Sequence, residues 1–221
     1  MDAQTAFDRI AQSGLMAGMR GKFPPEVALD HTAVLLEQGQ IDILEFTMNS
    51  ERPLEAMQAA IGRRVRHESF GMGTVLDAEM ARRVVDAGAD YLIAPSFNRE
   101  VVEVGHAAGL LVIPGVITPT EAVDAWATGA KLLKIFPIGV LGLEYFKAVR
   151  SPLSHIKFMC NGGMDDSNVG DFLKAGAVAC GMAGWLTGNG TMPLEQVGKR
   201  AALLREIVTS VRTGQKQRLT V

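Results

Sequence analysis

One local pattern recurs along the chain: a helical stretch, then a glycine, then a short run of apolar residues. It is found at Gly39, Gly88, Gly109, Gly129 and Gly176. Glycine just past a helix end adopts the left-handed conformation without a steric penalty, so each copy predicts a helix, a turn and a buried strand. Successive copies are separated by one or two multiples of roughly 20–25 residues, the length of one strand–helix unit. The chain is therefore expected to be a strand–helix array.

Eight apolar segments fit the strands of this array. They are Leu15 to Arg20, Ile41 to Thr47, His67 to Gly73, Tyr91 to Ala94, Leu110 to Pro114, Lys131 to Phe136, His155 to Cys160 and Ala177 to Gly181. Strands buried on both faces, without a dinucleotide-binding glycine motif after the first, favour a closed (β/α)8 TIM barrel over an open doubly wound sheet.

The two ends of the chain are expected to add to this barrel. Asp2 to Gln12 predicts an extra N-terminal helix, within residues 1–13, that covers the barrel floor. Leu194 to Arg212 predicts the eighth outer helix. Gly214 to Val221 is a polar tail, which is expected either to be disordered or to pack on a neighbouring subunit.

The size, composition and charge of the chain predict its number of domains, the kind of partner it binds and its compartment. With 221 residues and 48% hydrophobic content, residues 1–221 are expected to form a single domain. Because 22 basic residues face 24 acidic ones without a long basic run, a small molecule is a better candidate partner than nucleic acid or an acidic membrane. The absence of a leader or a long apolar run predicts a cytoplasmic protein. Cys160 and Cys180 are expected to be buried as free thiols.

Lys134 is an ionisable residue near the end of the apolar segment Lys131 to Phe136. Burial disfavours the charged form of an amine, which makes the amine a better nucleophile toward a carbonyl. The alternative, for any single lysine in a strand, is a side chain whose stem crosses apolar surface while its head reaches water.

Glu45 gives Lys134 a predicted partner. It lies near the end of the second strand and shares a face with Ile43 and Thr47 by the two-residue period. Barrel interiors are layered by side chains from alternate strands, so the second and sixth strands can bring Glu45 and Lys134 together. A purely structural ion pair is the alternative, but such pairs often fail to recover their desolvation cost, which favours a functional pair.

Glycine-rich loops follow the last two predicted strands. Asn161-Gly162-Gly163 follows the seventh strand and Ala183-Gly184 follows the eighth. These two loops form a phosphate site in many barrels, so an anion cradle is expected here, although each loop alone could be an ordinary turn. Arg20, at the end of the first strand, is expected either to clamp a carboxylate or phosphate or to lie in solvent. The four histidines show no metal-ligand spacing and are given no role.

Five segments carry a resemblance to a known family. They are Leu44 to Thr47, Gly71 to Leu76, Ile113 to Gly115, Leu133 to Pro137 and Gly162 to Gly163, in order along nearly the whole chain. Together they resemble the class I aldolases that split 2-keto-3-deoxy-6-phosphogluconate, its galactonate counterpart and 4-hydroxy-2-oxoglutarate. The resemblance implies a homotrimer without metal or cofactor that releases pyruvate with glyceraldehyde 3-phosphate or glyoxylate.

The same resemblance implies roles for individual residues. Lys134 would form the Schiff base, Glu45 would move protons through water, and Thr74 would be the hydroxyl near the pyruvate carboxylate. Pro95 and Phe136 complete the expected substrate-binding residues. Where the gluconate enzymes carry an arginine shortly after the glutamate, this chain has Met48-Asn49-Ser50, which together with Arg20 resembles the galactonate branch.

The eighth strand departs from the family. Relatives commonly carry a Gly-Ser pair for phosphate where this chain has Ala183-Gly184. Loss of one hydroxyl donor to a charged group weakens binding by about 1.5–3 kcal/mol. A non-phosphorylated keto acid or 4-hydroxy-2-oxoglutarate is therefore an open alternative. So are a sugar-phosphate isomerase or epimerase, which would form no covalent adduct, and a barrel that only binds a ligand.

Overall fold

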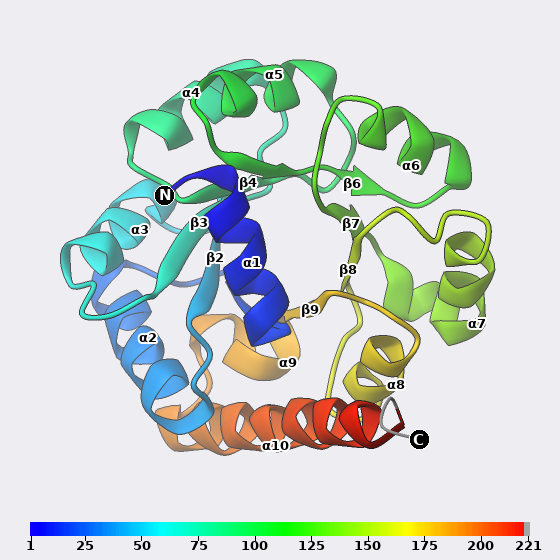
Figure 1. Ribbon diagram of the computed structural model, residues 1–221. Helices are drawn as coiled ribbons and strands as arrows, with labels where there is room; N and C mark the ends of the chain where they lie inside the picture. The colour runs from blue at the N-terminus through cyan, green and yellow to red at the C-terminus, as the bar shows by residue number, and fades with distance from the viewer. Residues whose placement is uncertain (219–221) are drawn as a thin grey trace.

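The computed structural model describes the backbone of residues 1–218 and the side chains of residues 1–214. Its strands form a ring that is surrounded by helices (Figure 1). The strands are β1 (Leu15–Met19), β2 (Ile43–Thr47), β3 (Ser69–Gly73), β4 (Tyr91–Ile93), β5 (Leu111–Ile113), β6 (Gly115–Val116), β7 (Leu133–Ile135), β8 (Phe158–Asn161) and β9 (Ala179–Met182). All neighbouring strands are parallel, in the order β5-β4-β3-β2-β1-β9-β8-β7-β6.

The predicted (β/α)8 barrel is confirmed, but its fifth strand is split at Pro114. β5 pairs with β4, whereas β6, two residues further along the chain, pairs with β7. Proline lacks a backbone N–H and so cannot continue a ladder as a donor. The Pro114 carbonyl instead accepts a hydrogen bond of 2.9 Å from the Lys134 N–H. The polypeptide itself therefore closes the ring between the two ends of the sheet.

The predicted start of the seventh barrel strand at His155 is wrong. The chain turns through this region, with Leu153 N–H bonded to Arg150 C=O at 3.1 Å and Ile156 N–H bonded to Leu153 C=O at 2.9 Å. β8 begins only at Phe158. The turn satisfies backbone groups locally, which an apolar-run pattern does not reveal.

Most helices form an outer ring around the barrel, and the first helix crosses one end of it (Figure 1). They are α1 (Ala3–Ser13), α2 (Pro25–Gly39), α3 (Pro53–Gly62), α4 (Ala78–Asp86), α5 (Arg99–Ala107), α6 (Pro119–Trp126), α7 (Ile138–Arg150), α8 (Val169–Lys174), α9 (Gly184–Thr187), η1 (Gly188–Gly190) and α10 (Leu194–Arg218). α10 extends beyond its predicted end at Arg212. The predicted tail from Gly214 thus starts inside this helix, and residues 219–221 lie outside the described part.

The glycine pattern is right at four of its five positions. Gly88, Gly109, Gly129 and Gly176 have positive φ angles of 84°, 73°, 87° and 99°. At the fifth position, the left-handed residue is Gln40, with φ 49°, and Gly39 is the last residue of α2. A Cβ on Gly39 would lie 2.6 Å from the Cβ of Ala201 in α10. Gly39 therefore serves the close packing of α2 on α10 rather than a turn.

Helix α1 covers the floor of the barrel, as predicted, and crosses the centre of the ring in Figure 1. The Asp2 side chain caps it by accepting hydrogen bonds from Gln4 N–H and Thr5 N–H. Ala6 and Ile10 pack against apolar side chains inside the barrel. We call this set the floor cluster: Ala6, Ile10, Met16, Ile43, Tyr91, Ile93, Leu111, Ile113, Leu132, Met159 and Ala179.

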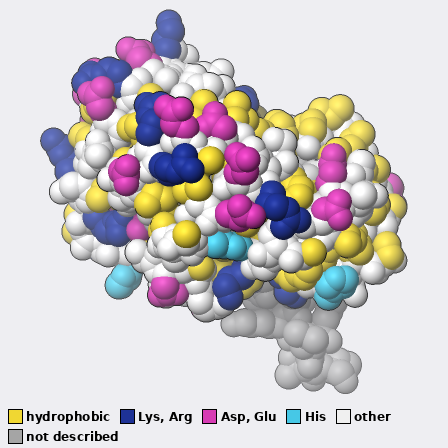
Figure 2. Space-filling view, turned by 90° about the horizontal axis from the view of Figure 1, so that it is seen from above, with side chains coloured by type: hydrophobic (Ala, Val, Ile, Leu, Met, Phe, Trp, Pro, Cys, Tyr) yellow, Lys and Arg dark blue, Asp and Glu magenta, His cyan; other side chains and the backbone are white. Residues whose placement is uncertain are grey.

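A second, larger apolar cluster lies between the barrel and its outer helices. Cys160 and Cys180 belong to it, directly opposite each other on β8 and β9, and both are free and buried. On the face shown in Figure 2, acidic and basic side chains are interspersed and form no continuous area of one sign. No helix in the described part of the chain is long and apolar enough to cross a membrane.

Candidate active site

Glu45 and Lys134 meet inside the mouth of the barrel. Glu45 lies on β2 and Lys134 on β7, and both side chains point into the interior, where they are 5% and 7% exposed. Lys134 Nζ lies 3.7 Å from Glu45 Oε1 and 4.9 Å from the centre of the Phe136 ring. The distance is too long for a good hydrogen bond and short enough for a proton to pass through one bridging water.

Glycines in neighbouring strands make room for the polar side chains. A Cβ on Gly73 would lie 1.9 Å from Glu45 Oε1, and a Cβ on Gly181 would lie 2.1 Å from Asn161 Nδ2. The Asn161 Oδ1 is buried and has no hydrogen-bond partner among the described residues. The interior volume that side chains would otherwise fill is therefore kept for the carboxylate, the carboxamide and a ligand.

Above the pair lies a cavity of about 320 Å³. Its lining includes nearly all of the predicted site residues: Arg20, Glu45, Thr74, Pro95, Lys134, Phe136, Asn161, Gly162, Gly163, Ala183 and Gly184. We call it the catalytic cavity. The exception is Asn49, which lines a neighbouring cavity of about 420 Å³ together with Arg20, Gly21, Lys22, Asn189 and Thr191. The role of each residue stays a prediction.

The catalytic cavity also contains residues outside the predicted set. They are Gly18, Thr47, Met164, Asp165, Gly181, Met182 and Trp185. Gly18 and Gly181 lie two residues before Arg20 and Ala183, so the two-residue period of a strand was a signal for both. Asp165 and Trp185 come from the segments that follow β8 and β9, where no period exists to place a side chain.

Thr74 has an unusual backbone conformation at the rim of the catalytic cavity. Its φ of 60° is in the left-handed region, which a β-branched residue rarely adopts. Holding such a residue there costs about 1–3 kcal/mol, and strained residues of this kind cluster at functional sites. A glycine would adopt this conformation without strain, so the presence of threonine supports a functional role for the Thr74 side chain.

Tyr91 lies beneath the pair, at the top of the floor cluster. Its ring crosses over Gly71, and its hydroxyl donates a 2.6 Å hydrogen bond to the Leu44 carbonyl. Burial raises the pKa of the Tyr91 hydroxyl well above its ordinary 10.0, and the charge of Glu45 adds to this shift. Tyr91 is therefore a neutral hydrogen-bond donor at the boundary between the floor and the site.

An anion cradle was predicted in the segments after β8 and β9, and both segments line the catalytic cavity. Gly162 and Gly163 both adopt positive φ angles, of 83° and 78°. Their carbonyls accept hydrogen bonds of 2.8 Å from Gly139 N–H and from Asn168 Nδ2. Ala183 and Gly184, across the cavity, present no side-chain donor. At Gly162, Gly163, Ala183 and Gly184 only backbone N–H groups could bind an anion, whereas Arg20 lines the same cavity with its guanidinium.

The described residues contain no group of three or more His, Cys, Asp or Glu side chains that could hold a metal ion. None of the four histidines lines the catalytic cavity. His31 is buried on α2, where Nδ1 lies 2.9 Å from the Val27 carbonyl, and burial lowers the pKa of its ring. The site is therefore made of amine, guanidinium, carboxylate, hydroxyl and amide groups.

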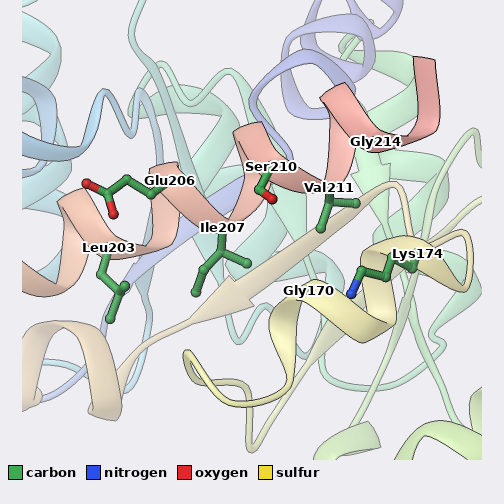
Figure 3. Close-up of a pocket in the computed structure, with 8 residues that line it drawn as sticks. All are labelled: Gly170, Lys174, Leu203, Glu206, Ile207, Ser210, Val211 and Gly214. Carbon is green, nitrogen blue, oxygen red and sulfur yellow. The ribbon is translucent and has the colours of Figure 1, made fainter. Parts of the chain in front are cut away.

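A larger cavity, of about 490 Å³, lies on the outside of the barrel between α8 and α10. Figure 3 shows Ile207 and Val211 of α10 beside Gly170 of α8. A Cβ on Gly170 would lie 3.2 Å from Ile207, so the glycine allows the two helices to approach closely. Lys174 is the one lysine or arginine among the residues that line it. This groove lacks a buried nucleophile, and the catalytic cavity is the better candidate site.

Comparison with known proteins agrees with this geometry. The family model described as "KDPG and KHG aldolase" matches residues 25–201, which is most of the chain. The chain belongs to this aldolase family. The match includes the segments that carry Glu45, Thr74, Lys134 and the two glycine-rich loops.

One relative within the KDPG and KHG aldolase family is a probable 2-dehydro-3-deoxy-6-phosphogalactonate aldolase of Rhizobium meliloti (strain 1021). It is 31% identical over 203 residues, which cover 91% of this chain and 94% of the relative. A solved structure described as native KDPGal is 28% identical, with a TM-score of 0.84 over 90% of this chain and 96% of its own. A designed cube-shaped protein cage, made by fusing symmetric oligomeric domains, is 27% identical with a TM-score of 0.85 over 93% of this chain and 76% of its own.

Proposed function

We propose that this chain is a class I aldolase. Its substrate is a 2-keto-3-deoxy-6-phospho sugar acid of the gluconate or galactonate type, and its products are pyruvate and glyceraldehyde 3-phosphate. Lys134 forms the Schiff base and Glu45 moves the protons. The observation that carries this proposal is the buried Lys134 Nζ, 3.7 Å from Glu45 Oε1 at the base of the catalytic cavity.

Each group in the pair has a step to perform. The neutral amine of Lys134 adds to the C2 carbonyl of the keto acid, and loss of water gives an iminium ion. Glu45, through water, takes the proton from the C4 hydroxyl as the C3–C4 bond breaks. The aldehyde leaves, and the electron pair of the broken bond enters the iminium, giving an enamine. Glu45 then returns a proton to C3, and water hydrolyses the new iminium to release pyruvate.

The surroundings support this assignment. Gly73 leaves the space that the Glu45 carboxylate occupies, and Phe136 lies against the amine of Lys134. Among the lysines whose side chains the structure describes, Lys134 alone is buried. The reaction needs no metal or cofactor, because the iminium itself accepts the electron pair.

The decisive experiment is chemical trapping. Wild-type protein is incubated with pyruvate and borohydride, which reduces an iminium to a stable secondary amine, and the modified peptide is located by mass spectrometry. We expect a carboxyethyl group on Lys134. The control is Lys131→Met, which removes an exposed lysine near the start of the same strand and should leave trapping unchanged. A folded sample that gives no adduct at Lys134 would refute the proposal.

Glu45 has a separate test. Glu45→Gln keeps the size of the side chain and removes its ability to carry a proton. We expect turnover to fall by about 10²–10⁴-fold, the usual contribution of general acid–base catalysis, while pyruvate still adds to Lys134. Wild-type turnover in this variant would show that Glu45 does not move protons in the reaction.

A second candidate substrate is 4-hydroxy-2-oxoglutarate, or another keto acid without phosphate. The observation that favours it is the absence of a side-chain donor at Ala183 and Gly184, opposite the Gly162–Gly163 turn. Turnover of the gluconate and galactonate compounds and of 4-hydroxy-2-oxoglutarate should be compared by kcat/KM in one pyruvate-release assay. A preference for 4-hydroxy-2-oxoglutarate would replace the phosphorylated substrate and leave the Schiff-base chemistry in place.

We also propose that the enzyme is a homotrimer in the cytoplasm. The designed cage is similar to this chain and is described as built from symmetric oligomeric domains, which supports an oligomer. Sedimentation equilibrium of the purified protein would give the mass of the assembly. A monomeric mass across micromolar concentrations would overturn the trimer.

A further inference from the structure

The Ser50 hydroxyl is hydrogen-bonded to the backbone on both sides of Arg20. Ser50 Oγ accepts a hydrogen bond of 3.0 Å from Gly21 N–H and donates one of 3.3 Å to the Met19 carbonyl. Arg20 lies between these two residues in the sequence. A hydroxyl has one donor and two acceptor positions, so it can make both bonds and still accept a third.

The third bond connects Ser50 to the catalytic cavity. Thr47 Oγ1 lies 2.7 Å from Ser50 Oγ, and Thr47 lines the same cavity as Glu45 and Lys134. Thr47 is the last residue of β2 and is 5% exposed. The loop that carries Arg20 is thus tied, through Ser50, to the strand that carries Glu45.

Two further backbone bonds hold the same loop. Glu51 N–H donates a hydrogen bond of 3.0 Å to the Gly21 carbonyl. On the opposite side, Lys22 N–H donates a hydrogen bond of 3.0 Å to the Asn189 carbonyl. Gly21 has a φ of 120°, and a Cβ there would lie 2.8 Å from the Asn189 carbonyl oxygen. The backbone around Arg20 is therefore fixed from both sides before any ligand binds.

The Arg20 side chain has no such fixed partner. Within the side chains that the structure describes, its guanidinium makes no ion pair and no hydrogen bond, and it is exposed at the point where the catalytic cavity meets the cavity lined by Lys22, Asn49 and Asn189. A guanidinium on a rigid backbone loses less freedom when it binds an anion, because only its own torsions remain to be ordered.

We propose that Ser50 is a positioning residue for substrate binding, which acts through Arg20. This inference rests on the proposed function and on the predicted role of Arg20 as a clamp for the anionic group of the keto acid far from Lys134. Ser50 holds Arg20 over the junction of the two cavities, and Arg20 contacts the anion. Ser50 itself touches neither the reacting carbons nor Lys134.

The test is a double-mutant cycle with Ser50→Ala, Arg20→Ala and the double variant. We expect Ser50→Ala to raise KM for the phosphorylated substrate by about tenfold with little change in kcat, because the lost interaction serves binding in the ground and transition states alike. In the Arg20→Ala background, Ser50→Ala should have no further effect on KM, because coupled residues are not additive.

The controls separate positioning from general damage to the fold. Ser50→Thr keeps the hydroxyl and should restore KM, and Ser154→Ala removes an exposed serine outside the site and should change nothing. Borohydride trapping of pyruvate on Lys134 should be unchanged in Ser50→Ala, because pyruvate lacks the distal anion. Loss of trapping in that variant would mean that Ser50 supports the whole site, and would overturn the proposal.

The cycle can also be measured without turnover, from the binding of glyceraldehyde 3-phosphate by calorimetry. We expect the dissociation constant to show the same coupling as KM. If Ser50→Ala weakens binding by the same factor with and without Arg20, Ser50 does not act through Arg20. Failure of the wild-type protein to bind this phosphate ester would overturn the anion role of Arg20, whereas failure of the proposed function shows instead as absent trapping on Lys134.

Discussion

The two ends of the barrel interior are built from the same strands and differ in chemistry. Ile43, Leu132 and Met159 belong to the floor cluster, and two residues further along the chain lie Glu45, Lys134 and Asn161. Two residues span about 6.6 Å of strand. Within that distance the interior changes from apolar packing under α1 to a buried amine, a carboxylate and a carboxamide.

The difference shows how the fold tolerates its polar end. Burying an apolar side chain such as Ile10 or Ile43 stabilises the folded state by about 1.5–3 kcal/mol. A buried ion pair often fails to recover its desolvation cost. The floor therefore supplies the stability, and the mouth can keep groups whose arrangement suits chemistry rather than folding.

The largest effect should come from breaking the pair at the mouth. Lys134→Met should reduce turnover by at least about 10⁴-fold, because no covalent intermediate can form. It should also destabilise the fold by about 3–5 kcal/mol, because Glu45 is left buried without a partner. The double variant Lys134→Met, Glu45→Leu should be inactive yet at least as stable as wild type, as judged by urea unfolding. Turnover in either variant would contradict the assigned role of Lys134.

A smaller effect is expected from filling the space beside Glu45. Gly73→Ala places a methyl group where Glu45 Oε1 lies, so the carboxylate has to move away. Because a displacement of about 1 Å can cost about 10²-fold in rate, we expect kcat to fall by roughly that factor. Gly62→Ala, at the end of α3 with open space around it, is the matched control and should keep full activity.

A substitution in the floor cluster should lower stability and leave turnover unchanged. Ile10→Ala leaves a cavity beneath the barrel and should lower the free energy of unfolding by about 2–5 kcal/mol. The mouth is not touched, so kcat per folded molecule should stay at the wild-type value at a temperature where the variant is folded. A fall in kcat without loss of stability would mean that the two ends are not independent.

The smallest effect is expected at Tyr91, on the boundary between the two ends. Tyr91→Phe removes the hydrogen bond to Leu44 and should destabilise the protein by about 0.5–1.5 kcal/mol. Because the folded pKa of Tyr91 is raised, the unfolded chain loses this proton near pH 10 while the folded protein keeps it. The free energy of unfolding of the wild-type protein should therefore fall as the pH rises above 10. In Tyr91→Phe, the contribution of Tyr91 to this fall should be absent.

Tyr145→Phe is the matched control for this measurement. Tyr145, on α7 outside the barrel, donates a 2.7 Å hydrogen bond to the Ile117 carbonyl. Both variants should be compared with wild type in urea unfolding at about pH 9 and about pH 11. An unchanged slope in Tyr91→Phe would show that Tyr91 ionises equally well in the folded and unfolded states.

The sequence predicted those features that depend on period. The two-residue alternation and the order of the strands were sufficient to place Glu45 and Lys134 on facing strands. The glycine pattern was sufficient for the strand–helix array. Both follow from local geometry that repeats along the chain.

Features that depend on contacts between distant segments were not predicted. The use of Gly39 for packing against Ala201 cannot be distinguished in the sequence from a helix-ending glycine. Pro114 splits its strand because Ile113 and Gly115 pair with different neighbours, which only the closed ring reveals. Asn49 follows β2 in an irregular segment and lines the neighbouring cavity, which shares Arg20 with the catalytic cavity.

The sealed floor has a consequence for the order of events in the proposed reaction. Met16, Ile43, Ile93, Leu132 and Met159 are fully buried, so among the described residues the route to Lys134 runs through the mouth. The departing aldehyde and the incoming hydrolytic water therefore both pass through the mouth of the barrel. An aldehyde that stays in the mouth blocks the entry of the hydrolytic water and remains close to the enamine, where the carbon–carbon bond can form again in the reverse direction.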